Sequence, residues 1–408
     1  MAEKYDIILG GGGLTGSIMA LALANYGFSI ALIDESTIKK KRMEPSDGRA
    51  YAINMAAAKM LSAVKIWSHL EKNAQPILDI KVSDGRAGEG ASPFYMHFDH
   101  RELSQGPLGF MMEDRFIRDV LLEAVTNHTN IKLFWGTSVM EQKVFPNFIE
   151  VKISSNKRLQ ANLLVGSDGR RSQIAANAQI KKNIFDYKQM GLVSVIAHQK
   201  DHLGQAHQFF MPSGPIAILP LSGRRSSLVW TLENTIAKRI VELNDTEYLN
   251  ELKYRVGDFR GKIALEGKRF SFPLNLVFAE NLVADRVALV GDSAHALHPL
   301  AGQGLNLGVR DIATLVEVLV QASRRGEDIG KQDVLSRYDS WRCLDRVTVT
   351  GFTHVVNKVF SNDNAFLKSL RGLSMATVNN STVLREKLFR EANGLLGDLP
   401  ALMKGQAL

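Results

Sequence analysis

The sequence predicts an α/β protein, and three observations lead to this fold class. An apolar strand, a glycine-rich turn, a helix and a second strand follow one another in residues 5–34. A second strand, glycine-rich loop and helix occupy residues 282–324. Short strands separated by turn residues lie between these units, in residues 207–232. At 408 residues the chain has room for two or three domains.

The first unit is a βαβ segment. Residues 5–9 form the apolar strand, and an Ala/Leu-rich helix runs from the glycine turn to Tyr26. Gly27 ends the helix, because glycine adopts the left-handed conformation that terminates helices. Residues 28–33 then form a second strand, which closes with Asp34.

The glycine turn has the spacing of a Rossmann-like dinucleotide-binding fingerprint. Gly11 permits the tight turn, Gly13 lets a pyrophosphate approach the backbone, and Gly16 lets the helix pack closely on the strand. The amides at the helix N-terminus have no intrahelical partners, so they favour the negative charge of phosphates. The residues expected to meet the phosphates are Gly11, Gly13, Leu14, Thr15 and Gly16.

Asp34 completes the fingerprint at the end of the second strand. Its carboxylate can accept hydrogen bonds from the hydroxyls of an adenosine ribose. It would repel a ribose 2′-phosphate, so NADP is disfavoured at this site. The motif leaves FAD and NAD open.

Composition limits the class of protein further. Hydrophobic residues make up 45% and charged residues 23%, which excludes a disordered or collagen-like chain. No apolar stretch at the N-terminus is long enough to span a membrane, and the acidic Glu3 and Asp6 argue against a signal peptide. We therefore expect a cytoplasmic protein. The single cysteine, Cys343, fits a reducing compartment, and we expect it to be a buried structural thiol.

The net charge of +8 favours an anionic partner. No zinc-finger spacing or aromatic RNA-binding signature is present, so nucleic acid is not expected. The basic run Lys39–Arg42 is interpreted as a solvated loop. No metal site is expected, because His295 and His298 lack a third nearby ligand.

The second glycine-rich unit carries a resemblance to a known family. Residues 291–306, which follow the strand expected at 282–290, resemble the flavin-binding GD motif of class A flavoprotein aromatic hydroxylases. Residues 163–172 are similar to the DG motif of the same group, which is associated with pyrophosphate and pyridine-nucleotide contacts. The resemblance implies the para-hydroxybenzoate hydroxylase fold with FAD as the cofactor.

A narrower resemblance points to one branch of that group. Residues 47–50, 291–306 and 395–400 resemble the ubiquinone-biosynthesis hydroxylases of the 2-octaprenylphenol or 2-octaprenyl-6-methoxyphenol hydroxylase type. This branch implies a monooxygenase that takes electrons from NADH or NADPH bound transiently, and O₂, and hydroxylates a prenylated phenol through a flavin hydroperoxide. The ring position and the choice of nicotinamide are not implied.

The resemblance also implies roles in the loop that follows the second strand. Asp292, after Gly291, would hold a ribityl hydroxyl of FAD. Backbone amides near the start of the next helix could stabilise negative charge on the reduced flavin. The loop residues implied to lie against the isoalloxazine are Gly302, Gly304, Leu305 and Asn306, with Pro299 and Gln303 at its reactive edge.

Three further residues are implied to contact the cofactor. Arg49 resembles the arginine that meets the cofactor after the second strand, and Arg115 resembles a basic residue opening a helix beside the pyrophosphate. Both arginines could instead form surface ion pairs. Asp168 belongs to the DG-like segment.

These motifs predict a discontinuous domain organisation. The FAD-binding domain is expected in residues 1–75, 100–180 and 280–325, and an inserted substrate domain with an antiparallel sheet in residues 76–99 and 181–279. Residues 326–408 are expected to form a helical C-terminal region. Its amphipathic stripe fits a peripheral contact at the inner face of the membrane, a biosynthetic complex or another subunit of a homo-oligomer, or packing on the FAD domain.

Two alternative functions remain open from the sequence. One keeps the fold but takes a soluble aromatic acid as the substrate. The other is a flavin-containing scaffold subunit without activity. The intact loop at residues 302–306 argues against a scaffold, because a scaffold does not need a flavin-edge loop.

Overall fold

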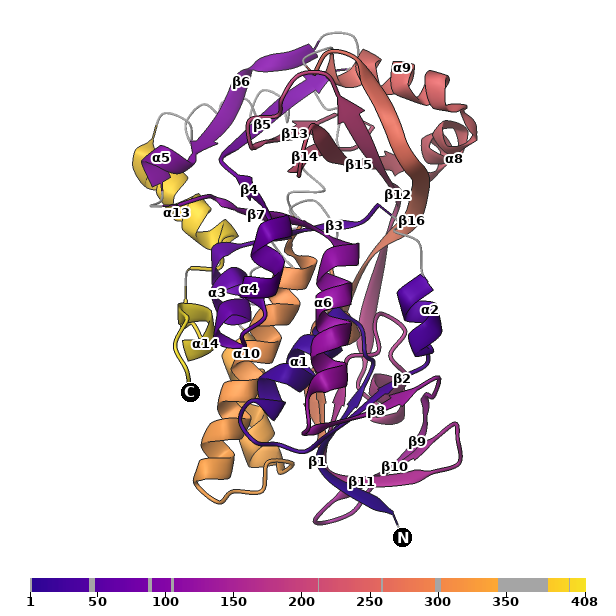
Figure 1. Ribbon diagram of the computed structural model, residues 1–408, viewed down its shortest axis with the longest axis vertical. Helices are drawn as coiled ribbons and strands as arrows, with labels where there is room; N and C mark the ends of the chain where they lie inside the picture. Colours follow the sequence, from indigo (N-terminus) through magenta and orange to yellow (C-terminus); the bar gives the residue numbers. More distant parts are fainter. Residues whose placement is uncertain are drawn as a thin grey trace.

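Two eight-stranded sheets and one three-stranded sheet form the molecule. In Figure 1 one large sheet lies in the lower half, the other lies at the top, and two long strands connect them. This arrangement confirms the α/β fold class. The computed structural model describes residues 2–43, 48–86, 90–103, 106–211, 213–257, 260–297, 302–343, 381–395 and 397–408.

The first sheet contains the predicted βαβ unit. Its strand order is β17-β18-β11-β1-β2-β8, with β10 and β9 continuing from β11. Strand β1 pairs in parallel with both β2 and β11 and is buried at Ile7, Ile8 and Leu9, as expected for a central strand of a parallel sheet. The strands are β1 (Glu3–Gly10), β2 (Ile30–Asp34), β8 (Ile131–Trp135), β9 (Val139–Val144), β10 (Ile149–Ile153), β11 (Arg158–Gly166), β17 (Val283–Ala284) and β18 (Val287–Leu289).

Three helices pack together beside this sheet. Helix α1 contacts both α6 and α10, and its Ala/Leu-rich sequence is buried on nearly every side. Apolar residues of the sheet and of these helices form one core. The helices are α1 (Leu14–Ala24), α6 (Asp114–Asn127) and α10 (Gln303–Arg324), with the short α7 (Gln173–Asn177) after the DG-like segment.

One predicted strand is wrong. Residues 282–290 form two short antiparallel strands, β17 and β18, rather than one strand. The chain reverses at Arg286, which has φ +55°. The Arg286 side chain is buried, forms an ion pair with Asp328 at 2.5 Å, and donates to the carbonyl oxygens of residues 145, 146 and 162. These bonds hold the turn that divides the strand.

The second sheet has the order β19-β16-β12-β15-β14-β13-β5-β6. The predicted hairpin strands in residues 207–232 are confirmed, because β13, β14 and β15 pair antiparallel in sequence order. The strands are β5 (Asp79–Arg86), β6 (Gly90–Asp99), β12 (Lys182–His198), β13 (Gln205–Phe210), β14 (Ile216–Leu221), β15 (Arg225–Glu233), β16 (Ile263–Ala279) and β19 (His295–Ala296).

Helices α8 (Asn234–Glu242) and α9 (Asp245–Val256) lie beside β12, β15 and β16 of this sheet. Asn244 and Glu247 form a capping box that begins α9, so the start of this helix is fixed by its own side chains. Trp230 and Tyr248 lie in the core between these helices and the sheet.

Strands β12 and β16 carry the second sheet down to the first (Figure 1). The lower end of β16 pairs with β19, which follows the turn η2 (Gly291–Ser293). The segment expected to bind the flavin is therefore attached to both large sheets.

A small sheet lies between the two large ones. It consists of β3 (Ala50–Ile53), β7 (Gly109–Glu113) and β4 (Gln75–Ile77), in the order β3-β7-β4. The short elements around it are α2 (Ile38–Met43), α3 (Met55–Ala63), α4 (Trp67–Leu70), η1 (Glu71–Asn73) and α5 (His100–Leu103).

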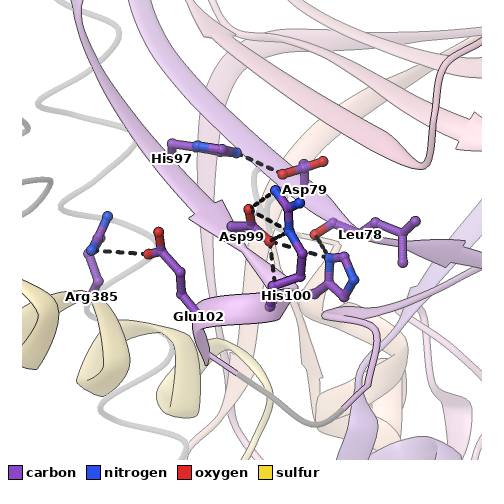
Figure 2. Close-up of polar contacts among 8 residues, drawn as sticks. Leu78, Asp79, His97, Asp99, His100, Glu102 and Arg385 are labelled. Atoms are coloured by element: carbon purple, nitrogen blue, oxygen red, sulfur yellow. Dashed lines mark hydrogen bonds and ion pairs between the residues drawn. The ribbon is translucent and has the colours of Figure 1, made fainter.

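The C-terminal helices α13 (Thr382–Ala392) and α14 (Ala401–Lys404) confirm the expected helical end of the chain. Figure 2 shows that α13 meets α5 through an ion pair between Arg385 and Glu102, at 3.1 Å. Beside it, Asp99 at the end of β6 pairs with Arg101, and His97 of β6 contacts Asp79 of β5. Phe389 enters the small core beneath the second sheet. The amphipathic stripe predicted at residues 360–373 lies outside the described residues.

Two further observations concern the exposure of the single cysteine and the length of the described helices. Cys343 is exposed, so the expectation of a buried thiol is wrong. The neighbouring residue in the same helix, which spans residues 332–343, is Arg342, and its side chain is fully buried. Among the described helices, none combines the length and the apolar character needed to cross a membrane.

Candidate functional site

A cavity of about 600 Å³ lies where the three sheets meet. Its walls come from the start of α1, from β3 and α6, from the residues around α10, and from strands β12, β15 and β16 of the second sheet. The lining changes along its length. Glycines and cationic side chains line the part beside α1, and apolar side chains line the part against the second sheet.

The first glycine turn is built as the fingerprint predicts. Gly11 has φ +104°, and a Cβ there would lie 2.3 Å from the carbonyl oxygen of Ser167. A Cβ on Gly16 would lie 1.8 Å from the carbonyl oxygen of Gly11, so both glycines are needed for close packing. Gly13 differs, because a Cβ there would have no heavy atom within 4 Å. Gly13 therefore leaves the backbone open to the cavity.

The start of helix α1 suits an anion. Its N-cap is Gly13, and no described side chain caps the helix or places an acid in its first turn. Gly13, Leu14 and Thr15 line the cavity. The amides of a helix N-terminus and the helix dipole attract phosphate.

Lys41 lies beside this turn, although the sequence analysis placed it in a solvated loop. That interpretation is wrong for Lys41. The basic run forms helix α2, and the Lys41 ammonium donates to the carbonyl oxygen of Gly12 at 2.8 Å and to Asp34 at 3.1 Å. It also lies 4.9 Å from the centre of the Trp135 ring. Lys41 thus brings a cation to the cavity wall.

Asp34 lies just behind the wall rather than on it. Its carboxylate accepts hydrogen bonds from the amides of Gly12 at 2.7 Å and Ser36 at 2.8 Å, in addition to Lys41. Gly12, Ser36 and Lys41 all line the cavity. The carboxylate therefore orients the groups that form this end of the site.

Helix α6 contributes a second cation. Arg118 lines the cavity and forms an ion pair with Asp114, which also accepts a hydrogen bond from the Tyr51 hydroxyl at 3.0 Å. Arg115 is not among the lining residues. It forms an ion pair with Glu113 at 3.0 Å and is half-exposed.

Glu113 links the two halves of the molecule. Its carboxylate, at the end of β7, also meets Arg225 of β15 at 2.9 Å. Burial alone would raise the pKa of Glu113, but the guanidinium groups of Arg225 and Arg115 outweigh burial and lower it. The carboxylate is therefore charged at neutral pH.

The GD-like and DG-like segments meet across the cavity mouth. Asp292 lies 3.3 Å from the Nε atom of Arg170, and both side chains are about half-exposed. Asp168 accepts a hydrogen bond from the amide of Ile174 at 3.1 Å and is not on the wall. Its other carboxylate oxygen is buried and has no partner among the described residues.

The second glycine turn begins helix α10. Gly302 has φ +60°, and a Cβ there would lie 3.0 Å from the Cβ of Ala52. Gly302, Gly304 and Leu305 line the cavity, and a Cβ on Gly304 would have open space around it. Gln303 is the first residue of the helix and is not on the wall. Pro299 lies outside the described residues.

Asn306 holds this turn in place. Its amide nitrogen donates to the carbonyl oxygens of Ala52 at 2.8 Å and Gly302 at 3.3 Å, and its Oδ1 atom accepts from the amide of Asn54 at 3.0 Å. The side chain is buried. Asn306 therefore ties the start of α10 to β3 and to the start of α3.

The far end of the cavity is apolar. Its lining comes from β12, β15, β16 and the residue after β19: Gly191, Val193, Val229, Phe272, Leu274 and Leu297. Gly191 lies on the middle strand of this wall, and a Cβ there would lie 3.3 Å from the side chain of Leu274, so the glycine makes room for Leu274. A flat aromatic group fits such a surface by dispersion and exclusion of water.

The structure thus brings most of the predicted residues to one place. Eight of them line the cavity: Gly13, Leu14, Thr15, Arg49, Asp292, Gly302, Gly304 and Leu305. Others support the wall from behind, namely Gly11, Gly16, Asp34, Gly291 and Asn306. Sequence reasoning missed Lys41, Tyr51, Asp114 and Arg118. The four-residue spacing of Asp114 and Arg118 on one helix face was the available signal for that pair.

These residues fit a flavin dinucleotide. Among the described residues, more cationic side chains than carboxylates line the cavity, which suits a diphosphate: Lys41, Arg49, Arg118 and Arg170 against Asp114 and Asp292, with Asp34 behind Lys41. The open space at Gly13 and at Gly304 leaves two stretches of backbone free to approach a ligand closely.

Comparison with known proteins agrees with this arrangement. The model of the family described as FAD binding domain, FAD_binding_3, matches residues 4–348. The ubiquinone hydroxylase UbiL of Rhodospirillum rubrum is 36% identical over 100% of this chain and 94% of its own length. The 3-demethoxyubiquinol 3-hydroxylase of Escherichia coli is 28% identical over 96% of this chain and 99% of its own.

A solved structure shows the same fold. The p-nitrophenol 4-monooxygenase PnpA from Pseudomonas putida DLL-E4 superposes with a TM-score of 0.79 at 17% identity. The match covers 97% of this chain and 99% of that chain.

Proposed function

This chain belongs to the FAD binding domain family, and from that premise we propose that it is a FAD-dependent monooxygenase. Its substrate is the aromatic ring of a prenylated phenol in ubiquinone biosynthesis. The single observation that carries the proposal is one cavity with a cationic end at the dinucleotide fingerprint and an apolar end against the second sheet. The names of the relatives with 36% and 28% identity support the choice of pathway.

FAD, when bound, supplies the chemistry that activates O₂ for transfer to an electron-rich ring. The chain's residues hold it. The amides at the start of α1, with Lys41, Arg118 and Arg170, would bind the diphosphate. The backbone of Gly304 and Leu305, at the start of α10, would face the flavin ring and favour negative charge on it.

The apolar wall orients the substrate and excludes water. Val193, Val229 and Phe272 offer no hydrogen-bonding group to a phenol, so the ring would be held by shape and dispersion. Exclusion of water by this wall would also suppress side reactions of the bound cofactor with water. We assign the substrate domain to residues 76–99 and 181–279, and the FAD domain to residues 1–75, 100–180 and 280–325; the sheet membership of β5, β6 and β12–β16 supports this division.

The electron donor in this proposal is NADH or NADPH, bound transiently. The sequence carries one dinucleotide fingerprint, and the cavity has one cationic end. A donor that binds and leaves fits this arrangement better than a second resident dinucleotide.

We further propose that the enzyme works at the cytoplasmic face of a membrane without spanning it. A prenylated phenol is lipophilic, and helix α13 exposes Val383, Leu384 and Leu388. Flotation with anionic liposomes at low salt is the measurement. Failure of the protein to float would contradict this part of the proposal, and membrane-free turnover of a soluble aromatic acid would favour the alternative substrate.

The proposed activity is tested on purified protein with its visible spectrum recorded first. Oxidation of NADH and of NADPH is then followed with and without a short-chain prenylated phenol, and the product is identified by mass spectrometry. We expect a flavin spectrum, oxidation stimulated by the phenol, and a product heavier by one oxygen atom. Bound flavin without turnover would contradict the monooxygenase and favour the scaffold.

A further inference from the structure

A fully buried charged cluster lies behind the GD-like turn. Asp311, in the third turn of α10, contacts the Nε2 atom of His295 at 2.9 Å through one oxygen. Its other oxygen accepts a hydrogen bond from the Nε atom of Arg342 at 2.8 Å. The side chains of Asp311 and Arg342 are 0% exposed and that of His295 is 1% exposed. Such a cluster is costly to bury, so its position needs an explanation.

The cluster is bonded directly to the turn. The oxygen of Asp311 that meets His295 also accepts a hydrogen bond from the amide of Gly291 at 3.0 Å. Gly291 has φ +62°, and a Cβ there would lie 2.8 Å from Thr15, which lines the cavity. The next residue, Asp292, is on the cavity wall. Asp311 therefore fixes the backbone from which the wall residue projects.

The carboxylate of Asp311 is charged in the folded protein. Burial alone would raise the pKa of Asp311, but His295 and Arg342 outweigh burial and lower it. Asp311 and Arg342 therefore carry opposite charges. Replacing Asp311 makes the cluster one unit more positive, and replacing Arg342 makes it one unit more negative, in the low-dielectric region behind the cavity where charges act strongly on one another.

We propose that Asp311, His295 and Arg342 are positioning residues that set the relative affinity of the site for oxidised and reduced FAD. Asp311 holds the Gly291 turn through its amide, and the opposite charges of Asp311 and Arg342 lie behind the turn that would hold the cofactor. Reduced flavin bears negative charge that oxidised flavin lacks. A net positive charge behind the site therefore favours the reduced form, and a net negative charge favours the oxidised form.

This inference rests on FAD binding and not on the proposed substrate. The two can therefore fail separately: a flavoprotein without phenol hydroxylation can still show the predicted redox behaviour.

The test uses the full-length FAD-loaded protein and measures two quantities without substrate. One is the Kd for oxidised FAD, and the other is the midpoint potential of the bound flavin by spectroelectrochemistry. D311N removes the negative charge but retains an oxygen for the Gly291 amide. We expect it to raise the affinity ratio of reduced to oxidised FAD about tenfold, which for a two-electron couple is about 30 mV.

R342M removes the positive charge and should shift the same ratio about tenfold in the opposite direction. The double variant D311N/R342M should return to within about threefold of the wild type, because both charges are gone. This double variant replaces a buried ion pair, a change that proteins often tolerate better than breaking the pair. R342K keeps the charge and should retain the wild-type potential. If one single variant does not fold, the other single variant carries the test, and the double variant checks that the shift comes from the charge.

The matched control is D328N, which breaks the ion pair of the partly exposed Asp328 with the buried Arg286. Neither Asp328 nor Arg286 lines the cavity. D328N should lower stability and leave the potential unchanged. Unchanged potentials in D311N and R342M, shifts of the same sign in both, a shift in D328N equal to theirs, or a double variant far from the wild-type potential would each overturn the proposal.

Discussion

The two ends of the cavity are built by different means. The cofactor end consists of a helix N-terminus, bare glycine backbone and cationic side chains brought in by α2, α6 and the DG-like segment. The substrate end consists of apolar side chains on neighbouring strands of one sheet. The first end recognises charge through backbone amides and a few cationic side chains. The second end recognises shape through apolar side chains alone. Binding of cofactor and substrate should therefore respond to different substitutions.

The largest effect should come from the glycine turn. In G16A the new Cβ would lie 1.8 Å from the carbonyl oxygen of Gly11, so backbone must move. We expect a destabilisation of about 3 kcal/mol, measured by urea unfolding, together with loss of the flavin spectrum. G13A is the matched variant, because its Cβ meets open space. It should fold normally and bind FAD about tenfold more weakly, since the added carbon occupies the approach to the backbone. Equal stability of the two variants would contradict this difference.

The next largest effect should change phenol binding at one end of the cavity without changing FAD binding at the other. F272A removes an aromatic side chain from the apolar wall and should raise the KM for the phenol about tenfold or more, because contact with the bound phenol would bury this partly exposed ring and contribute roughly 2 kcal/mol. The Kd for FAD should remain unchanged. F278A, on the same strand but partly exposed and not on the wall, is the control and should leave both constants unchanged. Weaker FAD binding in F272A would show that the two ends are not separate.

A smaller effect, on FAD binding and not on phenol binding, is expected at the cofactor end. K41M removes one of four cations and should weaken FAD binding about fivefold to tenfold, with a reduced dependence on salt. The KM for the phenol should stay the same. K40M, on the same short helix but exposed, is the control. Fluorescence titration of FAD at two salt concentrations measures the difference, and identical titrations for K41M and K40M would contradict the role of Lys41.

The smallest effect is expected at Glu113, which links the small sheet to the second sheet through Arg225. The pKa of Glu113 is lower in the folded protein than its ordinary value, so its carboxylate stabilises the fold above the unfolded pKa of about 4.3. This contribution is lost as the pH falls through the lowered folded pKa. E113Q should therefore be about 1 kcal/mol less stable than the wild type at pH 7, and the gap should narrow below about pH 4. A gap in unfolding free energy that does not change with pH would contradict the assignment.

The cofactor end was largely predictable because its chemistry is carried by backbone and spacing. Gly11, Gly13 and Gly16 fix a turn whose shape follows from the absence of Cβ atoms, and the order of strand, turn and helix is local in sequence. Lys41 escaped prediction because only the folded chain shows that α2 turns this one lysine of a basic run toward Asp34. The two short strands at residues 283–289 were missed because Arg286 meets Asp328 and carbonyl groups distant in sequence.

The substrate end could not be predicted from motifs. Gly191, Val229 and Phe272 belong to three strands that meet only through the pairing of β12 with β15 and β16. Turn residues between short strands predicted the central hairpins, but they do not say which apolar face borders a cavity and which borders a helix. The pairing register supplies that information.

The pairing of β12 with β16 also bears on how the substrate end can move. The two strands form one continuous ribbon from the second sheet to the strand after the GD-like turn, so no flexible linker separates the two halves there. The register of the ribbon shifts at two places, between Asp186 and Gln189 and between Val193 and Val195. The segment between them, from Gln189 to Val193, contains the cavity residues Gly191 and Val193. The wall behind the substrate is thus a five-residue segment bounded by two register irregularities toward β16, where a strand bends locally. Its pairing with β15 runs unbroken from Gln189 to Ala197, so any bend of this segment is shared with β15.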